Sequence, residues 1–273
     1  MSQDRKPISI AGTSSSEEAS LPSLALGETK PGRPALVLIV WAISLIVLAG
    51  LAPVMQATMG LPFELLSLVM LAPAFACTVV LIVPSWMPEP WKRVGGSSVL
   101  LAAMVSVVAV VVFFVVLALA TGSKPSLPAS VGDAPLVLFL ALQAVGALSE
   151  EIGWRGVVQR CGERFARPAA VSAIAGFLFG ATHLGYWELG ILPVLTFAFT
   201  AMLMSLTITA IFTGSFWQRM IPAVIVHLGL NLTITCLASG GEPIGTSLGA
   251  LGAAAAMLIV AAIVKGLVIR RGR

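Results

Sequence analysis

The sequence predicts an all-α polytopic membrane protein with about eight transmembrane helices. Apolar residues make up 58% of the 273-residue chain and charged residues only 10%, whereas a soluble globular domain carries about 25% charged residues. Eight apolar segments are each long enough to cross the roughly 30 Å hydrocarbon core of a bilayer. Lysine and arginine gather at alternate ends of these segments, which is how basic residues mark the cytoplasmic side of a membrane protein.

The eight segments are separated by proline, glycine and polar residues, which typically end helices. They cover residues 35–53, 62–83, 98–121, 134–160, 168–187, 191–213, 217–239 and 247–269. The fourth segment is longer than a span requires, so we expect it to leave the hydrocarbon near Arg155 and to continue as a helix in the interface. Small residues dominate positions 249–256, and such a surface suits close helix packing.

The chain divides into a polar tail and a membrane domain. Residues 1–33 are rich in Ser, Glu and Pro and lack the apolar core of a signal peptide. We therefore expect a disordered cytoplasmic N-terminal tail, followed by one transmembrane domain over residues 34–273. With the N-terminus in the cytoplasm, every basic residue except Lys124 falls on the cytoplasmic side, as does the C-terminus. Short loops and the lack of a targeting segment favour a bacterial plasma membrane.

Charge and cysteine content argue against several functions. The net charge of +4 is small, and no basic stripe occurs outside the helix ends, so nucleic acid is not an expected partner. The three cysteines, Cys77, Cys161 and Cys236, show neither a CxxC motif nor a spacing typical of metal ligands. We therefore predict no disulfide and no redox role.

A few polar residues interrupt the apolar segments. Glu150 and Glu151 lie in the fourth segment, and a charge near the centre of a bilayer costs at least about 2.5–3.5 kcal/mol. The chain has only two histidines, His183 and His227, and only one asparagine, Asn231, and each falls in another apolar segment. At about 1.5 Å per residue, Glu150 and His227 lie roughly 15 Å from the cytoplasmic helix ends, and the other two about 21–22 Å. These side chains therefore share one slab of the membrane and are predicted to form one site.

The spacing of these residues adds detail. Glu151 and Arg155 are four residues apart with the acid first, which favours an ion pair on a helix. This pairing would leave Glu150, about 100° round the helix, facing elsewhere. Gly176 and Gly180 form a GxxxG pattern that brings a membrane helix close to its neighbour.

Three motifs resemble the CAAX-protease and bacteriocin-processing (CPBP, or Abi) family of intramembrane endopeptidases. Residues 150–156, EEIGWRG, match its EExxxR motif, residues 179–183, FGATH, match FxxxH, and residues 227–231, HLGLN, match HxxxN. The motifs occur in the family's order on three separate helices, and the resemblance covers about residues 134–239. It implies a CAAX-protease-like helical bundle with peptidase activity.

The resemblance also implies roles for individual residues. Peptide hydrolysis needs an activated water, an oxyanion stabiliser and a proton for the leaving amine. Glu150 and His183 would bind and deprotonate the water, and His227 and Asn231 would stabilise the oxyanion. The supporting residues would be Glu151, Arg155, Phe179 and Trp154, although Trp154 also fits an aromatic anchor at the membrane interface.

The sequence leaves the metal requirement open. Family members are often named metalloproteases, and Glu150, His183 and His227 are the residues that would hold zinc if it is present. However, the sequence contains no HExxH motif, and the two histidines come from different helices. We therefore predict water activation by glutamate without a cofactor, with zinc as the alternative.

The leading hypothesis is an intramembrane endopeptidase whose partners are the lipid bilayer and a membrane-associated peptide or protein. A proton-coupled transporter is an alternative, because membrane Glu and His residues also build proton relays. Inverted repeats would favour a transporter, and the sequence shows none. A third possibility is a non-catalytic scaffold or immunity protein that retains the site for structure.

Overall fold

The computed structural model describes residues 32–126, 130–131, 133–238 and 243–271, and this part of the chain is mainly helical. The predicted all-α class is confirmed. Residues 1–31 of the predicted tail lie outside the described residues.

The long α-helices are α1 (Pro34–Met59), α3 (Gly96–Thr121), α4 (Leu136–Glu151), α7 (Ile191–Ile211), α8 (Phe216–Leu237) and α9 (Leu248–Arg271). Shorter α-helices are α2 (Ala72–Leu81), α5 (Gln159–Gly162) and α6 (Pro168–Ala181). Short 3₁₀-helices form η1 (Leu68–Leu71), η2 (Pro84–Trp86), η4 (Leu184–Leu189) and η5 (Ile244–Thr246), and η3 (Ile152–Val158) is a π-helix. The antiparallel strands β1 (Ser130–Val131) and β2 (Ala134–Pro135) pair with Ser130 opposite Pro135.

Six helices of the described residues are long and apolar enough to cross a membrane, which makes the chain an integral membrane protein. They are Pro34–Met59, Gly96–Thr121, Leu136–Gly162, Ile191–Ile211, Phe216–Leu237 and Leu248–Leu267. The other two of the eight predicted segments contain shorter apolar helices, Leu68–Thr78 and Pro168–Ala181. The 14 residues of α6 rise only about 21 Å, less than the roughly 30 Å hydrocarbon core.

The segment after α1 returns along the whole of that helix although α2 is short. Gly60 ends α1 in the left-handed conformation, at a φ of 64°. The backbone N–H of Arg33, which precedes α1, donates to the carbonyl of Trp86 at 2.8 Å. The chain between Met59 and Trp86 therefore runs back to the N-terminal end of α1, and part of its length is not α-helical.

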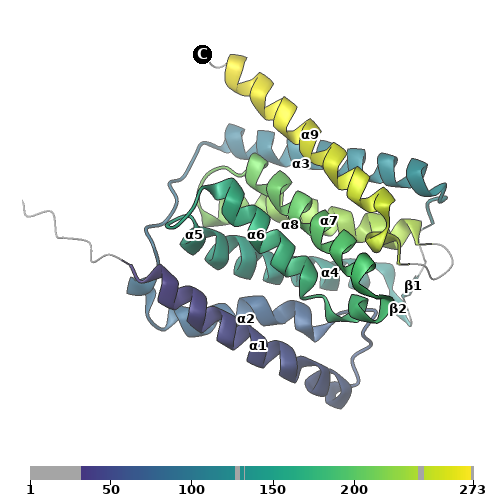
Figure 1. Ribbon diagram of the computed structural model, residues 1–273, viewed down its shortest axis with the longest axis horizontal. Coiled ribbons are helices and arrows are strands. Elements are labelled where there is room, and N and C mark those ends of the chain that lie inside the picture. The colour runs from purple at the N-terminus through teal and green to yellow at the C-terminus, as the bar shows by residue number, and fades with distance from the viewer. Residues whose placement is uncertain (1–31, 127–129, 132, 239–242, 272–273) are drawn as a thin grey trace, which may run out of the picture. The chain divides into compact units, whose positions relative to one another are not determined.

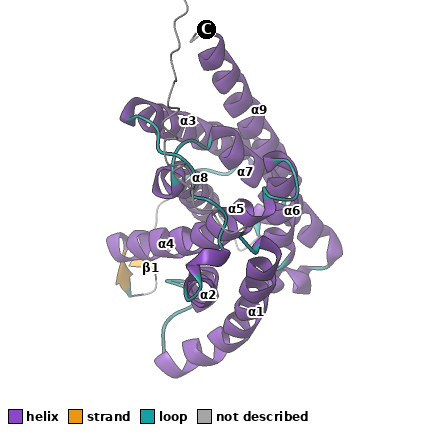
Figure 2. Ribbon diagram, turned by 90° about the vertical axis from the view of Figure 1, so that its left-hand side faces the viewer, coloured by secondary structure: helices purple, strands orange, loops and turns teal. Residues whose placement is uncertain are grey.

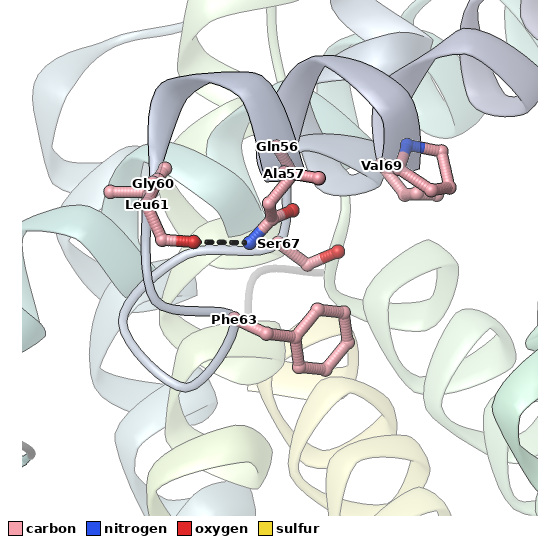
Figure 3. Close-up of a pocket in the computed structure, with 8 residues that line it drawn as sticks. Gln56, Ala57, Gly60, Leu61, Phe63, Ser67 and Val69 are labelled. Atoms are coloured by element: carbon pink, nitrogen blue, oxygen red, sulfur yellow. Dashed lines mark hydrogen bonds between the residues drawn. The ribbon is translucent and has the colours of Figure 1, made fainter.

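Side chains satisfy the backbone of this irregular stretch. Gln56 is buried near the end of α1, and its amide donates to the carbonyls of Leu61 (3.2 Å) and Leu66 (3.0 Å). The same amide accepts the backbone N–H of Leu68 at 2.9 Å. Figure 3 shows the bond to Leu61 at the wall of a pocket of about 320 Å³. Because an unpaired backbone group is costly in an apolar environment, Gln56 stabilises this non-helical path.

Helix α4 contributes two more bonds of the same kind. Gln143 donates to the carbonyl of Leu65 at 3.0 Å, and Ser149 donates to the carbonyl of Leu71 at 3.0 Å. These hydrogen bonds hold the segment before α2 against α4, the helix that carries Glu150 and Glu151.

Helices α4 and α8 contact each other, α2 lies against α4, and α3 and α7 contact α8 (Figures 1 and 2). Helix α1 lies beside α2, α3 lies beside α8 and α9, and α7 lies between α6 and α9. A β-carbon on Gly180 would lie 2.5 Å from the Cα of Ala198, and one on Gly176 would lie 2.8 Å from the carbonyl oxygen of Ala201. The GxxxG pattern thus allows α6 to approach the backbone of α7, as predicted.

The linker between α2 and α3 contacts both the end of α5 and the start of α8. The indole N–H of Trp91 donates to Glu163 at 3.1 Å, and the guanidinium of Arg219 lies 4.2 Å from the Trp91 ring centroid. Gln218 exchanges two hydrogen bonds with the backbone of Val94, at 2.9 and 3.1 Å. These contacts brace the two helical segments that carry the first and third motifs.

Candidate active site

The first motif lies where α4 changes into a π-helix. Glu150 and Glu151 are the last residues of α4, and η3 follows from Ile152. A β-carbon on Gly153 would lie 2.6 Å from the β-carbon of Pro73, and one on Gly156 would lie 2.5 Å from the ring of Phe216. The predicted helix therefore continues, but with a wider turn where two neighbours pack close to its backbone. Such π-turns occur frequently at functional sites.

Arg155 lies in the protein interior. Its side chain is only 1% exposed, so neighbouring protein groups enclose it near the point where the fourth segment is expected to leave the hydrocarbon. Its Nη1 lies 3.2 Å from Oε1 of Glu151, which is the ion pair that the spacing predicts. The guanidinium also lies 5.6 Å from the ring centroid of Phe179. A buried guanidinium needs a nearby anion, and Glu151 supplies it.

Both glutamates face one imidazole. Oε1 of Glu151 lies 2.7 Å from Nδ1 of His227, and Oε2 of Glu150 lies 3.4 Å from Nε2 of the same ring. The expectation that Glu150 faces elsewhere is therefore wrong. His227 and Glu150 are 3% and 6% exposed, so this contact is almost completely shielded from solvent. The result is a continuous chain of charged and polar groups from Glu150 through His227 and Glu151 to Arg155.

His183 lies just beyond α6 rather than on it. The predicted helix over residues 168–187 ends at Ala181, and side chains form hydrogen bonds with carbonyl groups of its last turn. Thr182 donates to the carbonyl of Phe179 at 3.0 Å, and Trp187 donates to that of Ala181 at 3.0 Å. Nδ1 of His183 lies 2.7 Å from the same Phe179 oxygen. Because a carbonyl only accepts, Nδ1 carries the hydrogen, and Nε2 of a neutral ring is left to accept a proton.

The phenyl ring of Phe179 contacts all three motifs. It meets the rings of His183 and His227 edge to face, with centroids 4.6 and 5.6 Å apart. It meets Trp154 in the same way at 5.7 Å, with Arg155 beside it. A buried aromatic ring fixes its neighbours at little entropic cost, so Phe179 acts as the packing centre of the cluster.

Asn231 is the predicted catalytic residue with the fewest contacts. It is half-buried on α8, one turn beyond His227. Its backbone carbonyl accepts a bond from Thr235 at 2.9 Å, but among the described residues no hydrogen bond holds its side-chain amide. Its position on α8 is therefore the only feature of the described structure that places this amide.

Some residues at the site were not predicted from the sequence. Trp41 on α1 meets Trp154 edge to face at 5.1 Å and donates to the carbonyl of Pro73 at 3.2 Å. Tyr186 and Phe197 both contact the ring of His183. Tyr186 is the only tyrosine of the chain and follows the second motif by three residues, so its position was a usable signal. Nothing in the sequence around Trp41 or Phe197 distinguishes them from other apolar positions.

The arrangement does not form a set of metal ligands. Among the residues that the structure describes, no three His, Cys, Asp or Glu side chains converge as they would around a metal ion. Both ring nitrogens of His227 already face carboxylate oxygens. Glu150, His183 and His227, the residues considered for zinc, therefore do not fit such an ion as they stand.

Comparison with known proteins agrees with these motifs. Residues 132–233 match the family model described as Rce1-like, type II CAAX prenyl endopeptidase. Over these residues the chain is similar to an Rce1-like domain. This domain includes all three motifs, and it confirms the resemblance inferred from them. No curated protein matches the chain.

Proposed function

We propose that the chain is an intramembrane endopeptidase that hydrolyses a peptide bond in a membrane-associated peptide or protein. The observation that carries this proposal is the approach of Glu150 and Glu151 to His227, at 3.4 and 2.7 Å, inside an Rce1-like domain. Three costly polar groups from α4 and α8 are buried together in a protein with six apolar helices. Such a buried cluster is typical of a functional site.

In the proposed reaction, Glu150 and His183 hold and activate the water. The carboxylate of Glu150 takes a proton as the water oxygen attacks the scissile carbonyl carbon. Nε2 of His183 accepts a hydrogen bond from the same water, because Nδ1 is committed to the Phe179 carbonyl. Glu150 then passes its proton to the amide nitrogen as the carbon–nitrogen bond breaks. The second proton of the water passes from the new carboxylic acid to the amine, so the products are a carboxylate and an ammonium group, and the enzyme returns to its starting state.

His227 and Asn231 are proposed to stabilise the oxyanion. Glu151 orients the imidazole through Nδ1 at 2.7 Å, as a carboxylate does for a catalytic histidine. Because Nδ1 faces the Glu151 carboxylate, His227 can donate from Nε2 only when both ring nitrogens carry a hydrogen, and the proposed role requires that form; the side-chain amide of Asn231 is a neutral second donor. Two carboxylates, one imidazolium and the Arg155 guanidinium then balance in charge.

We further propose that the reaction needs no metal and that both termini face the cytoplasm of a bacterial cell. The distribution of lysine and arginine supports this orientation. The return of residues 60–86 along α1 agrees with it, because it brings Lys92 and Arg93 to the side where α1 begins.

A membrane proteome comparison tests the proposed activity. Cells with the wild-type protein should accumulate new C-terminal ends in membrane proteins, and cells with Glu150→Ala, His183→Ala or His227→Ala should not. Glu64→Ala is a matched control, because Glu64 is exposed and lies outside the cluster. Any protein cleaved in a wild-type-dependent way then supplies the peptide for an assay with purified enzyme. Full activity of any of the three cluster variants would overturn the assignment.

A further inference from the structure

The imidazole of His183 depends on its neighbours for its orientation. The residue lies beyond the end of α6, with backbone angles of −76° and 80° that belong to no helix. The one hydrogen bond of its imidazole within the described residues joins Nδ1 to the carbonyl of Phe179 at 2.7 Å. A single bond of this kind leaves the ring free to tilt about the bond, so packing must determine where Nε2 points.

Two further aromatic rings enclose the imidazole. The ring of Phe197, on α7, lies 4.9 Å from that of His183 at an interplanar angle of 60°. The ring of Tyr186, on η4, lies 6.3 Å away and nearly parallel, at 15°. Tyr186 and Phe197 also contact each other at 4.5 Å. The ring of Phe179, whose centroid lies 4.6 Å from that of His183, also contacts the imidazole, so three aromatic rings surround it.

The backbone ties Tyr186 to the residue that it covers. The N–H of Tyr186 donates to the carbonyl of His183 at 3.0 Å, which closes the first turn of η4. Phe197 is held by the long helix α7, whereas Tyr186 is held by η4, the short helix that follows His183 directly. This arrangement fixes the tilt of the imidazole with rings that carry no charge.

We propose that Tyr186, braced by Phe197, is a positioning residue that keeps Nε2 of His183 directed toward the water in the proposed reaction. The inference rests on the proposed function, because His183 acts on that water. Tyr186 acts through its ring, so phenylalanine should replace it and alanine should not.

Kinetics with a cleaved membrane peptide test the proposal. Tyr186→Ala should lower kcat by about 10–100-fold, as expected for a small misplacement of a reacting group, with KM changed by less than about threefold. Phe197→Ala should have a similar effect, and Tyr186→Phe should remain close to the wild type. Leu189→Ala is the matched control, because Leu189 is an exposed residue of the same 3₁₀-helix, η4. A rise in KM with an unchanged kcat would instead make Tyr186 a substrate contact and overturn the proposal.

A second measurement does not depend on activity. The chain has only two histidines, so protein with ¹⁵N-labelled histidine gives NMR signals from two imidazoles, and His183→Gln identifies those of His183. Tyr186→Ala should shift or broaden the His183 signals and leave those of His227 in place, while Tyr186→Phe and Leu189→Ala should change neither. Unchanged His183 signals in Tyr186→Ala would contradict the positioning role. Full activity of His183→Gln would instead refute the proposed function, whatever the NMR result.

Discussion

Nδ1 of His227 lies 2.7 Å from Oε1 of Glu151, although 76 residues separate the two in sequence. The same carboxylate oxygen lies 3.2 Å from Nη1 of Arg155. Glu151 therefore connects the ion pair within its own helical segment to the imidazole on α8. Because it serves two partners, its removal should affect both stability and activity.

Glu151→Gln should lower kcat by about 10²–10⁴-fold, since a neutral replacement of a carboxylate that orients a catalytic histidine has effects of this size. The change leaves the shape of the side chain but removes the charge that faces His227 and Arg155. Cleavage of a membrane peptide by purified protein measures the effect. Glu64→Gln, at an exposed position, should retain wild-type activity, and equal activity of the two variants would contradict the role of Glu151.

Arg155→Met should destabilise the protein by about 3–5 kcal/mol, because the partner of a buried charge is removed. The double variant Glu151→Gln/Arg155→Met should recover most of this loss, since it removes both charges together. Unfolding in detergent by urea compares the three proteins. The double variant should remain inactive, and a double variant no more stable than Arg155→Met would show that the two side chains are not energetically coupled.

Gly153→Ala should destabilise the protein by about 1–3 kcal/mol, the usual cost of overpacking. Its β-carbon would lie 2.6 Å from the β-carbon of Pro73 and 3.0 Å from the Pro73 carbonyl oxygen. Gly252→Ala on α9 is the matched control, because nothing lies within 4 Å of its β-carbon. This control should be stabilised by about 0.5–1 kcal/mol. Thermal unfolding of both proteins measures the difference, and an unaffected Gly153→Ala would mean that α2 does not pack tightly on the π-turn.

Removal of divalent metal should leave activity unchanged, because the proposed water activation uses only side chains. Enzyme dialysed against a chelator is assayed on its peptide before and after zinc is added back, with metal content measured in parallel. A zinc-dependent protease of known chelator sensitivity serves as the positive control. Loss of activity that one equivalent of zinc restores would show that Glu150, His183 and His227 rearrange into ligands.

The features that the sequence predicts correctly depend on local spacing. The Glu151–Arg155 pair follows from four residues of helix, and the close approach at Gly180 follows from the GxxxG pattern. The convergence on His227 follows from the high cost of polar groups in a membrane, although the sequence does not show that Glu150 and Glu151 share this one ring.

The features that the sequence does not predict depend on distant neighbours. The π-turn at Gly153 reflects the packing of Pro73, which lies 80 positions earlier in the chain. The end of α6 reflects side-chain bonds from Thr182 and Trp187 that compete with a further helical turn. Hydropathy cannot detect either effect, because it averages over residues without regard to their partners. Hydropathy therefore does not distinguish the two segments that contain short helices from the other six.

The long separation of Glu151 from His227 bears on how the protein is made. The ribosome completes α4 well before it reaches α8, so a nascent chain holds two membrane-embedded acids with only Arg155 to neutralise them. Translation that stops early leaves Glu150 without its imidazole. The cluster of Glu150, Glu151 and His227 is therefore complete only after almost all of the membrane domain has been synthesised.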